Sequence, residues 1–152
     1  MDGLDVSSLA SVLSALGEQL GIPGLAFDHN NCCRLVFDDR QMLELRAAGA
    51  QRRLVLSSRL GQAGAQWPSG AERKLLQANL WRAGTGGGWF ALDEHGQACL
   101  QQDVVIEDGG IAELLMKIEA MLNSLDLWER HLQEGVEASS PVASPLRNFP
   151  RV

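Results

Sequence analysis

The fold of this chain is decided by residues 75–96, Leu75-Leu76-Gln77-Ala78-Asn79-Leu80-Trp81-Arg82-Ala83-Gly84-Thr85-Gly86-Gly87-Gly88-Trp89-Phe90-Ala91-Leu92-Asp93-Glu94-His95-Gly96. The leucines come at helical spacing, glycines interrupt them, and an apolar run then leads into a turn-forming tetrad. The stretch therefore predicts a helix, a glycine hinge, a strand and a tight turn. It carries much apolar surface and no catalytic pair, which indicates a protein that binds other polypeptides rather than one that performs chemistry.

The residues at the start of the chain predict a helix over 5–20. Apolar side chains recur there at spacings of three and four, the pattern of an amphipathic helix. Gly21 and Pro23 form a strong stop signal after it. The apolar stripe consists of Val6, Leu9, Leu13, Leu16 and Leu20.

Three runs that alternate apolar and polar side chains follow this helix. They cover residues 33–37, 42–47 and 53–57. Asp38-Asp39-Arg40 supplies the first turn and residues 48–51 supply the second, so the short links predict an antiparallel meander with one apolar face. The earlier run 25–27 is predicted to be a lead-in or an edge strand.

The second half of the chain predicts a helix, two strands and a third helix. Ser69 and Glu72 are spaced as a capping box, so the second helix is expected to begin there and to end at Gly84. Residues 89–92 and 98–106 are predicted to be strands that the turn tetrad joins.

Asp108 is the predicted N-cap of the third helix, and Trp128 and Leu132 extend the apolar stripe of that helix. The stripe begins with Ile111, Leu114, Leu115, Ile118, Leu122 and Leu125. The order helix, three strands, helix, two strands, helix predicts an α+β fold in which helices pack an antiparallel sheet.

Composition and charge narrow the function classes. The chain has 152 residues and a net charge of −6, which argues against nucleic-acid and anionic-membrane partners. The length predicts one domain, placed at residues 1–134, and the proline- and serine-containing residues 135–152 are predicted to be a flexible tail. No secretory signal, membrane-spanning run or disulfide framework is apparent, so the expected location is the cytoplasm.

The glycine run 84–88 invites comparison with a phosphate-binding loop. Such a loop needs a Lys-Ser/Thr pair and a helix immediately after it, whereas Trp89 stands in the place of the lysine and a strand follows. A flexible hinge between helix and strand is the better interpretation.

Histidines and cysteines could be combined on paper into a zinc site or a nucleophile–base pair. The residues are His29, Cys32, Cys33, His95 and Cys99. Adjacent cysteines on a strand point to opposite faces and no orienting third group is apparent, so Cys33 and Cys99 are predicted to be small core hydrophobes. Asp38-Asp39 and Asp93-Glu94 fall at predicted turns, which explains both acidic pairs without catalysis. No metal, cofactor or enzymatic activity is expected.

Trp81 and Trp89 flank the glycine run and leave two interpretations open. Large aromatic side chains can belong to a protein core, and they are also favoured anchors at protein interfaces. The sequence favours neither interpretation over the other.

Three motifs together are similar to a known family. They are Leu75-Leu76-x-x-Asn79-Leu80 with Leu92-Asp93-x-x-Gly96 after the glycines, the early Phe27-Asp28, and Leu35-Val36-Phe37-Asp38-Asp39. With the order of elements, they resemble the class I type III secretion chaperones, the Tir-chaperone (CesT-like) family, over residues 4–132. The resemblance implies a secretion-chaperone-like fold for residues 1–134 and gives no role to the tail.

The resemblance also implies a function and its residues. It implies a cytoplasmic homodimer of a Gram-negative bacterium that binds the N-terminal segment of a secreted effector and keeps it extended, soluble and secretion-competent. It names the secretion ATPase as a candidate further partner. The implied dimer interface is Leu76, Leu80, Trp81, Trp89 and Phe90. The implied effector-binding residues are Leu9, Leu13, Leu16, Phe27, Leu35, Phe37 and Leu43.

Two other classes of function compete with the chaperone. A non-enzymatic regulatory or small-molecule-binding α+β domain would need a closed pocket with convergent polar groups, and the sequence shows no such cluster. A metal-dependent enzyme would use His29, His95 and the cysteines, and metal analysis of the purified protein tests it.

Overall fold

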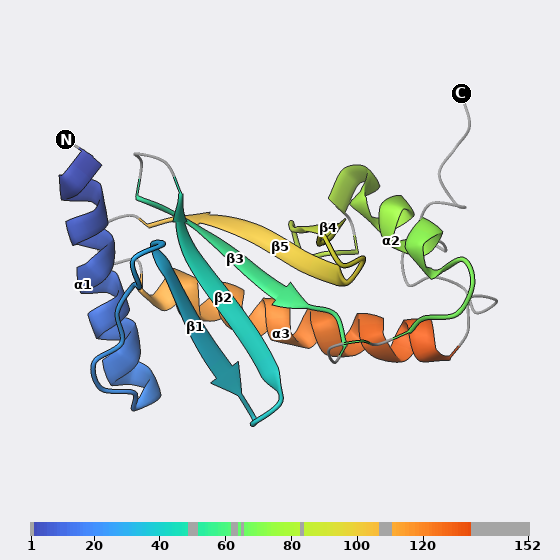
Figure 1. The fold of residues 1–152 in the computed structure, drawn as a ribbon, viewed down its shortest axis with the longest axis horizontal. Helices are drawn as coiled ribbons and strands as arrows, with labels where there is room; N and C mark the ends of the chain where they lie inside the picture. Colours follow the sequence, from blue (N-terminus) through green and yellow to red (C-terminus); the bar gives the residue numbers. More distant parts are fainter. Residues whose placement is uncertain are drawn as a thin grey trace. The chain divides into compact units, whose positions relative to one another are not determined.

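The computed structural model describes residues 2–48, 52–61, 64, 66–82, 84–106 and 111–134, with side chains from Leu9 onward. Within these residues the chain forms three α-helices, a short 3-10 helix and five strands (Figure 1). The elements are α1 (Asp2–Leu20), β1 (Cys32–Phe37), β2 (Gln41–Ala48), β3 (Arg53–Arg59), α2 (Ala71–Asn79), η1 (Leu80–Arg82), β4 (Trp89–Leu92), β5 (Ala98–Val105) and α3 (Ile111–Gln133). The strand order is β1-β2-β3-β5-β4. The predicted α+β class and order of elements are confirmed.

Contacts divide the chain into two compact units, each with its own apolar core. Unit 1 comprises Met1–Ser58 and Gln101–Ala120, and unit 2 comprises Arg59–Leu100 and Met121–Val152. Buried side chains of unit 1 include Leu9, Leu13, Leu16, Leu35, Leu43, Leu45, Leu54, Leu56, Val104, Leu114 and Ile118. Those of unit 2 include Leu60, Leu75, Phe90, Leu100, Met121, Leu125, Trp128 and Leu132.

The end of α1 is fixed by two glycines. Gly21 has a φ of +73°, and its N–H donates to the carbonyl oxygen of Glu18 at 3.3 Å. The N–H of Ile22 donates to the carbonyl oxygen of Gly17 at 2.8 Å, which completes a Schellman motif. A Cβ on Gly17 would lie 2.5 Å from the carbonyl oxygen of Ile22. The predicted stop is therefore confirmed, and both glycines are needed for it.

The turn between β1 and β2 depends on its two aspartates. Asp38 and Asp39 have φ values of +54° and +56°, the backbone of a type I′ turn. The N–H of Arg40 closes the turn by donating to the carbonyl oxygen of Phe37 at 3.1 Å. Asp tolerates positive φ better than most residues, so the acidic pair serves the turn, as the sequence predicts.

The antiparallel register of β1 and β2 separates an apolar from an exposed face. Leu35 lies opposite Leu43, and both are buried. Val36 lies opposite Met42, and both are exposed. The alternation predicted for these strands is confirmed, and it places an apolar pair on the outer face as well.

Asp28 builds a turn just before β1. Its Oδ1 accepts the backbone N–H of Asn30 at 2.8 Å and of Cys32 at 3.0 Å. The N–H of Asp28 donates to the carbonyl oxygen of Cys32 at 2.8 Å, and Asn31 sits at a φ of +58°. These bonds, with Cys32 first, hold the pKa of the Asp28 carboxyl below its usual value. The run 25–27 before this turn forms no strand within the described residues, because no neighbouring strand pairs with it.

Asp93 repeats the same turn between β4 and β5. Its Oδ1 accepts the N–H of His95 at 2.8 Å and of Gln97 at 2.9 Å, and Gly96 takes the positive φ. The predicted tetrad turn is confirmed. The bonds to Gln97 and His95 hold the pKa of the Asp93 carboxyl below its usual value.

We expect Asp93→Asn to make the free energy of unfolding fall less steeply as the pH is lowered into the acid range. A carboxyl whose pKa is lower in the folded state stabilises the fold fully above its unfolded pKa, and loses that effect as pH falls through the folded pKa. Urea titrations at about pH 5 and pH 3 should show a smaller loss of the free energy of unfolding for Asp93→Asn than for wild type. A combined Asp28→Asn, Asp93→Asn variant should reduce the loss further. Equal losses in all three proteins would contradict this role.

Helix α2 begins and ends elsewhere than predicted. Its N-cap is Gly70, with φ at +89°, and no side chain caps the helix, so Ser69 and Glu72 form no capping box. Gly70, with its positive φ, occupies the N-cap position that the sequence predicts for Ser69. The helix ends at Asn79 rather than at the glycine run, because Leu80 turns to φ −65° and ψ 119°.

Some predictions fall outside the described residues. They concern the N-cap Asp108, the tail 135–152 and most of the turn 48–51. The single domain over residues 1–134 stays a prediction. In the part of the chain that the structure describes, each helix is too short or too polar to cross a membrane.

Candidate functional site

The candidate site is an apolar surface of unit 2 on α2, η1 and β4. Its exposed side chains are Leu76 (69%), Leu80 (58%), Trp81 (78%) and Leu92 (51%). We call these four residues the α2–β4 surface. Large apolar side chains gathered on exposed elements mark protein interaction sites more often than single ones do.

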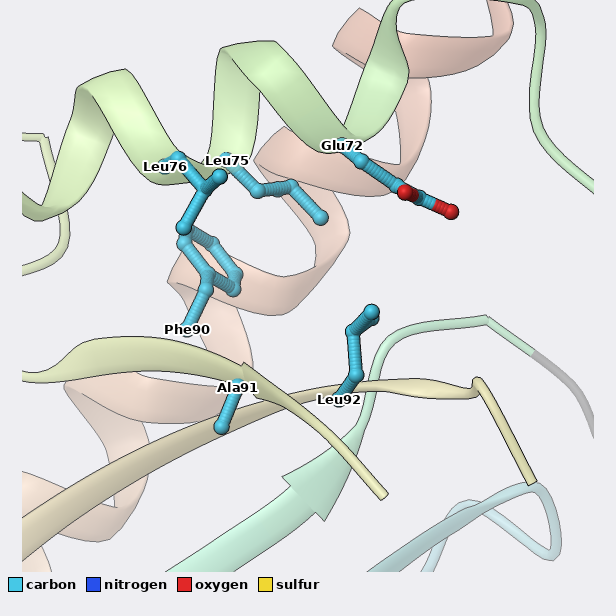
Figure 2. Close-up of a pocket in the computed structure, with 6 residues that line it drawn as sticks. All are labelled: Glu72, Leu75, Leu76, Phe90, Ala91 and Leu92. Carbon is cyan, nitrogen blue, oxygen red and sulfur yellow. The ribbon is translucent and has the colours of Figure 1, made fainter. Parts of the chain in front are cut away.

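A small pocket lies between α2 and β4 (Figure 2). It is lined by Glu72, Leu75, Leu76, Phe90, Ala91 and Leu92 and has a volume of about 90 Å³. Glu72 is the single charged side chain of this lining, and the rest is apolar. Pockets for small molecules usually have at least roughly 300 Å³. The pocket therefore suits one apolar side chain of a partner polypeptide.

Asn79 fastens β4 to the end of α2. Its Nδ2 donates to the carbonyl oxygen of Phe90 at 2.9 Å, and its Oδ1 accepts the N–H of Phe90 at 2.7 Å. One side chain thus satisfies both backbone groups of a strand residue, as a neighbouring strand would. Because Leu76 and Leu92 sit on the two elements so joined, Asn79 fixes the shape of the pocket.

Trp128 of α3 packs against Phe90, one of the residues that line the pocket. It is 1% exposed, and its ring meets that of Phe90 edge-on at 5.2 Å. Its Nε1–H donates to the carbonyl oxygen of Gly84 at 2.7 Å. His131 stacks edge-on against the same indole, and the pKa of His131 is lowered by burial and by nearby Lys74. Trp128 therefore ties the glycine run to the core.

Side chains hold the glycine run, which the sequence predicts to be a flexible hinge. The Thr85 hydroxyl is buried, 2.7 Å from the carbonyl oxygen of Gly88 and 3.2 Å from that of Arg82. With the Trp128 bond, these contacts hold Gly84, Thr85 and Gly88 in place within unit 2. Gly86 and Gly87 take positive φ, as glycine does readily.

The backbone of η1 turns Trp81 outward. Trp81 and Arg82 have φ values of +64° and +51°, which non-glycine residues rarely adopt. The Arg82 guanidinium then lies 5.3 Å from the ring centre of Trp89, as a cation–π pair. Trp89 is accordingly half-buried, whereas Trp81 is the most exposed of the large apolar side chains described.

The structure distributes the predicted dimer residues over three levels of exposure. Leu76, Leu80 and Trp81 are exposed, Trp89 is half-buried and Phe90 is 5% exposed. It brings Leu76 and Phe90 together in one pocket. Their place in a dimer interface stays a prediction.

Most of the predicted effector-binding residues lie inside unit 1. Phe27 and Phe37 are partly exposed. The five leucines at 3% exposure or less are Leu9, Leu13, Leu16, Leu35 and Leu43. In the single chain they can support a binding surface from beneath but cannot line it. Their effector-binding role stays a prediction.

A second exposed feature of unit 1 is the free side of β1. Cys32 uses its N–H and carbonyl oxygen for Asp28, on the side away from β2. Asn31, by contrast, accepts the N–H of Ala47 from β2. Since antiparallel strands alternate bonding sides, the backbone groups of Arg34 and Val36 also point away from β2. We call these groups the β1 edge.

The cysteines and acidic residues do not gather into a chemical site. Across the residues that the structure describes, no three His, Cys, Asp or Glu side chains come together as metal ligands. Cys32 and Cys33 are both buried, and burial raises the pKa of both thiols. Raised thiol pKa values disfavour the thiolate that metal binding or nucleophilic attack requires.

Sequence reasoning missed four residues that shape these surfaces. Asn79 belongs to one of the family motifs, but the sequence does not reveal its bonds to Phe90, and Trp128 is predicted only as a member of a stripe. Val36 and Met42 alternate with core residues, so their positions place both on the face opposite the core. A large apolar residue on that face is the signal that would have found them.

We expect Asn79→Ala to destabilise unit 2. Removing the amide leaves the N–H and carbonyl oxygen of Phe90 without their hydrogen-bond partner. This should lower the free energy of unfolding by about 2–3 kcal/mol. Urea titration measures the change, and Gln77→Ala, an exposed site on α2, is the matched control. A loss no greater than that of the control would show that water replaces the Asn79 bonds.

The chain matches one family of known proteins. The model of the Tir chaperone protein (CesT) family matches residues 11–129. No curated protein matches the chain.

Solved structures show the same fold. The crystal structure of the ExsC–ExsE complex has a TM-score of 0.74 at 21% identity, covering 84% of this chain and 96% of that one. The HopA1–SchA chaperone–effector complex has a TM-score of 0.65 at 23% identity, covering 89% and 99%. The Yersinia pestis type III secretion chaperone SycH, in complex with a stable fragment of YscM2, has a TM-score of 0.64 at 18% identity, covering 78% and 98%. With the family match over most of its length, the chain belongs to the Tir chaperone (CesT) family.

Proposed function

We propose that this chain is a type III secretion chaperone. It binds the N-terminal region of an effector protein and keeps that region extended, soluble and competent for secretion. The observation that carries the proposal is the family match over residues 11–129. The similar HopA1–SchA structure is itself a chaperone–effector complex, which supports the same class of partner. The mechanism is binding and includes no chemical step.

The proposed chaperone works as a homodimer in the cytoplasm of a Gram-negative bacterium, with the secretion ATPase as a candidate further partner. The α2–β4 surface supports the dimer, because a second copy would cover Leu76, Leu80 and Trp81 and could fill the pocket with one apolar side chain. Trp89 is half-buried and Phe90 is buried, so both would support the exposed interface residues from the core of unit 2.

The proposed client site lies on unit 1. An extended client can add a strand to the β1 edge, whose backbone groups at Arg34 and Val36 point away from β2. Phe27 and Phe37 would contact client side chains directly. The buried leucines Leu9, Leu13, Leu16, Leu35 and Leu43 would support that surface from the core.

Affinity capture from the native host tests the function. The tagged chain should co-purify with a larger protein that the bacterium secretes through its type III system, and deletion of that protein's N-terminal region should abolish the association. Recovery of no such protein under secreting conditions, or binding that survives the deletion, would overturn the proposal.

A further inference from the structure

The segment between residues 32 and 58 of unit 1 carries a surplus of positive charge in a chain whose net charge is −6, although one of its arginines, Arg53, pairs with Asp103 of β5 at 3.2 Å. Between residues 32 and 58 there are five arginines and three acidic residues, a surplus of two. The arginines are Arg34, Arg40, Arg46, Arg52 and Arg53, and the acidic residues are Asp38, Asp39 and Glu44. An acidic partner segment would therefore meet less repulsion here than the overall charge suggests.

Two of these arginines share one carboxylate on the outer face of the β1–β2 hairpin. The Arg34 Nε lies 3.1 Å from Glu44 Oε2, and the Arg46 Nη2 lies 3.0 Å from Glu44 Oε1. The arginine side chains are 57% and 58% exposed. A guanidinium has five N–H donors, so each has donors left for a second carboxylate after its contact with Glu44.

An apolar pair lies two residues further along the same face. Val36, 59% exposed, faces Met42, 43% exposed, across the register that also pairs Arg34 with Glu44. Side chains at positions i and i+2 of a strand share a face, so Arg34 and Val36 point to the same side of β1. The β1 edge thus presents a cation and an apolar side chain in a row.

A client strand added to this edge would place its side chains beside Arg34 and Val36. Directly opposite residues of neighbouring strands have Cβ atoms about 5 Å apart, and opposite charges or apolar pairs there stabilise the pairing. We propose that the β1 edge selects client segments in which an acidic and an apolar residue, two positions apart, lie beside Arg34 and Val36. This inference rests on the proposed chaperone function and specifies the chemistry of its client.

Two synthetic peptides test this selection by NMR on the ¹⁵N-labelled full chain. One is acetyl-Ser-Val-Thr-Glu-Thr-Val-Ser-Gly-amide, which places Val two positions from Glu in either strand direction, and the other carries Lys in place of Glu. The glutamate peptide should shift the amide signals of Arg34 and Val36 and bind roughly fivefold more tightly than the lysine peptide. Arg34→Glu should reverse the order of the two peptides.

Arg130→Glu is the matched control, because it makes the same charge change at an exposed arginine of α3. It should keep the preference for the glutamate peptide. Equal affinity for both peptides, a preference that Arg34→Glu fails to reverse, or unchanged Arg34 and Val36 signals up to the peptide's solubility limit would overturn the inference. Capture of an effector from the native host would then still support the chaperone function, so the two failures are distinguishable.

Discussion

Leu76→Glu is expected to convert the proposed homodimer into a monomer with a mass near 16.5 kDa. Leu76 is 69% exposed in the single chain and lines the pocket between α2 and β4, so a second copy would have to bury the new carboxylate. Burying an unpaired charge costs several kcal/mol, which corresponds to a loss of affinity of about a thousandfold or more. Multi-angle light scattering across a concentration series measures the change.

Met116→Glu is the control for this experiment. Met116 is also 69% exposed, but it lies on the part of α3 that belongs to unit 1. It should leave the dimer mass at about twice that of the chain. Trp81→Glu should act like Leu76→Glu, because Trp81 is a member of the same surface. A monomeric wild-type protein, or a dimer that survives both charge substitutions, would remove the α2–β4 surface from the interface.

Trp128→Ala is expected to cause a large loss of stability, about 3–5 kcal/mol in the free energy of unfolding. The substitution opens a cavity at a side chain that is 1% exposed and removes the contacts to Phe90 and His131. It also leaves the carbonyl oxygen of Gly84 without the indole N–H. Urea titration followed by far-UV circular dichroism measures the change without relying on tryptophan fluorescence.

Two further variants separate the causes of that loss. Trp128→Phe keeps most of the ring volume and removes the N–H, so a loss of about 1–3 kcal/mol is expected from the unpaired carbonyl. Leu127→Ala, at the neighbouring half-exposed position, should cost much less. If Trp128→Ala lowered the free energy of unfolding no more than Leu127→Ala, the contacts of Trp128 would not stabilise unit 2.

The order of elements could be predicted because the periodicity of apolar residues is local. Leu35 and Leu43 alternate with polar neighbours, and Leu9, Leu13 and Leu16 repeat at helical spacing, whatever the rest of the chain does. The turn at Asp38 and the stop at Gly21 follow from backbone preferences of single residues. These features need no knowledge of distant contacts.

The end of α2 and the exposure of single side chains could not be predicted from local periodicity. Helix α2 ends at Asn79, where Leu80 leaves the helical backbone, and the Asn79 side chain bonds to Phe90, eleven residues away. The sequence cannot tell a leucine that packs inward from one that faces outward, so Leu13 and Leu76 look alike although one is 0% and the other 69% exposed. Family resemblance supplied roles for both residues, but not this difference.

The same limit explains the glycine run. Five residues with four glycines read as a flexible link, whereas Thr85 and Trp128 fix it through hydrogen bonds to backbone carbonyls. Trp128 lies 44 positions from Gly84, so no local pattern announces the contact. The family resemblance needs none of these distant contacts, because its motifs are short and follow one another in the sequence, and the family match covers residues 11–129.

The left-handed backbone at Trp81 and Arg82 lowers the stability of the single chain. Each non-glycine residue at positive φ lowers the stability of the folded chain by roughly 1–2 kcal/mol. Glycine adopts this conformation freely, as Gly86 and Gly87 do. The isolated chain is therefore less stable with an exposed indole at position 81 than it would be with glycine. Single Trp81→Gly chains should unfold at a higher urea concentration than single wild-type chains. The proposed dimer of this variant should be weaker than that of wild type. In the proposed dimer, the contact made by the Trp81 indole would come at a cost to the stability of each subunit, and the two measurements together give both effects.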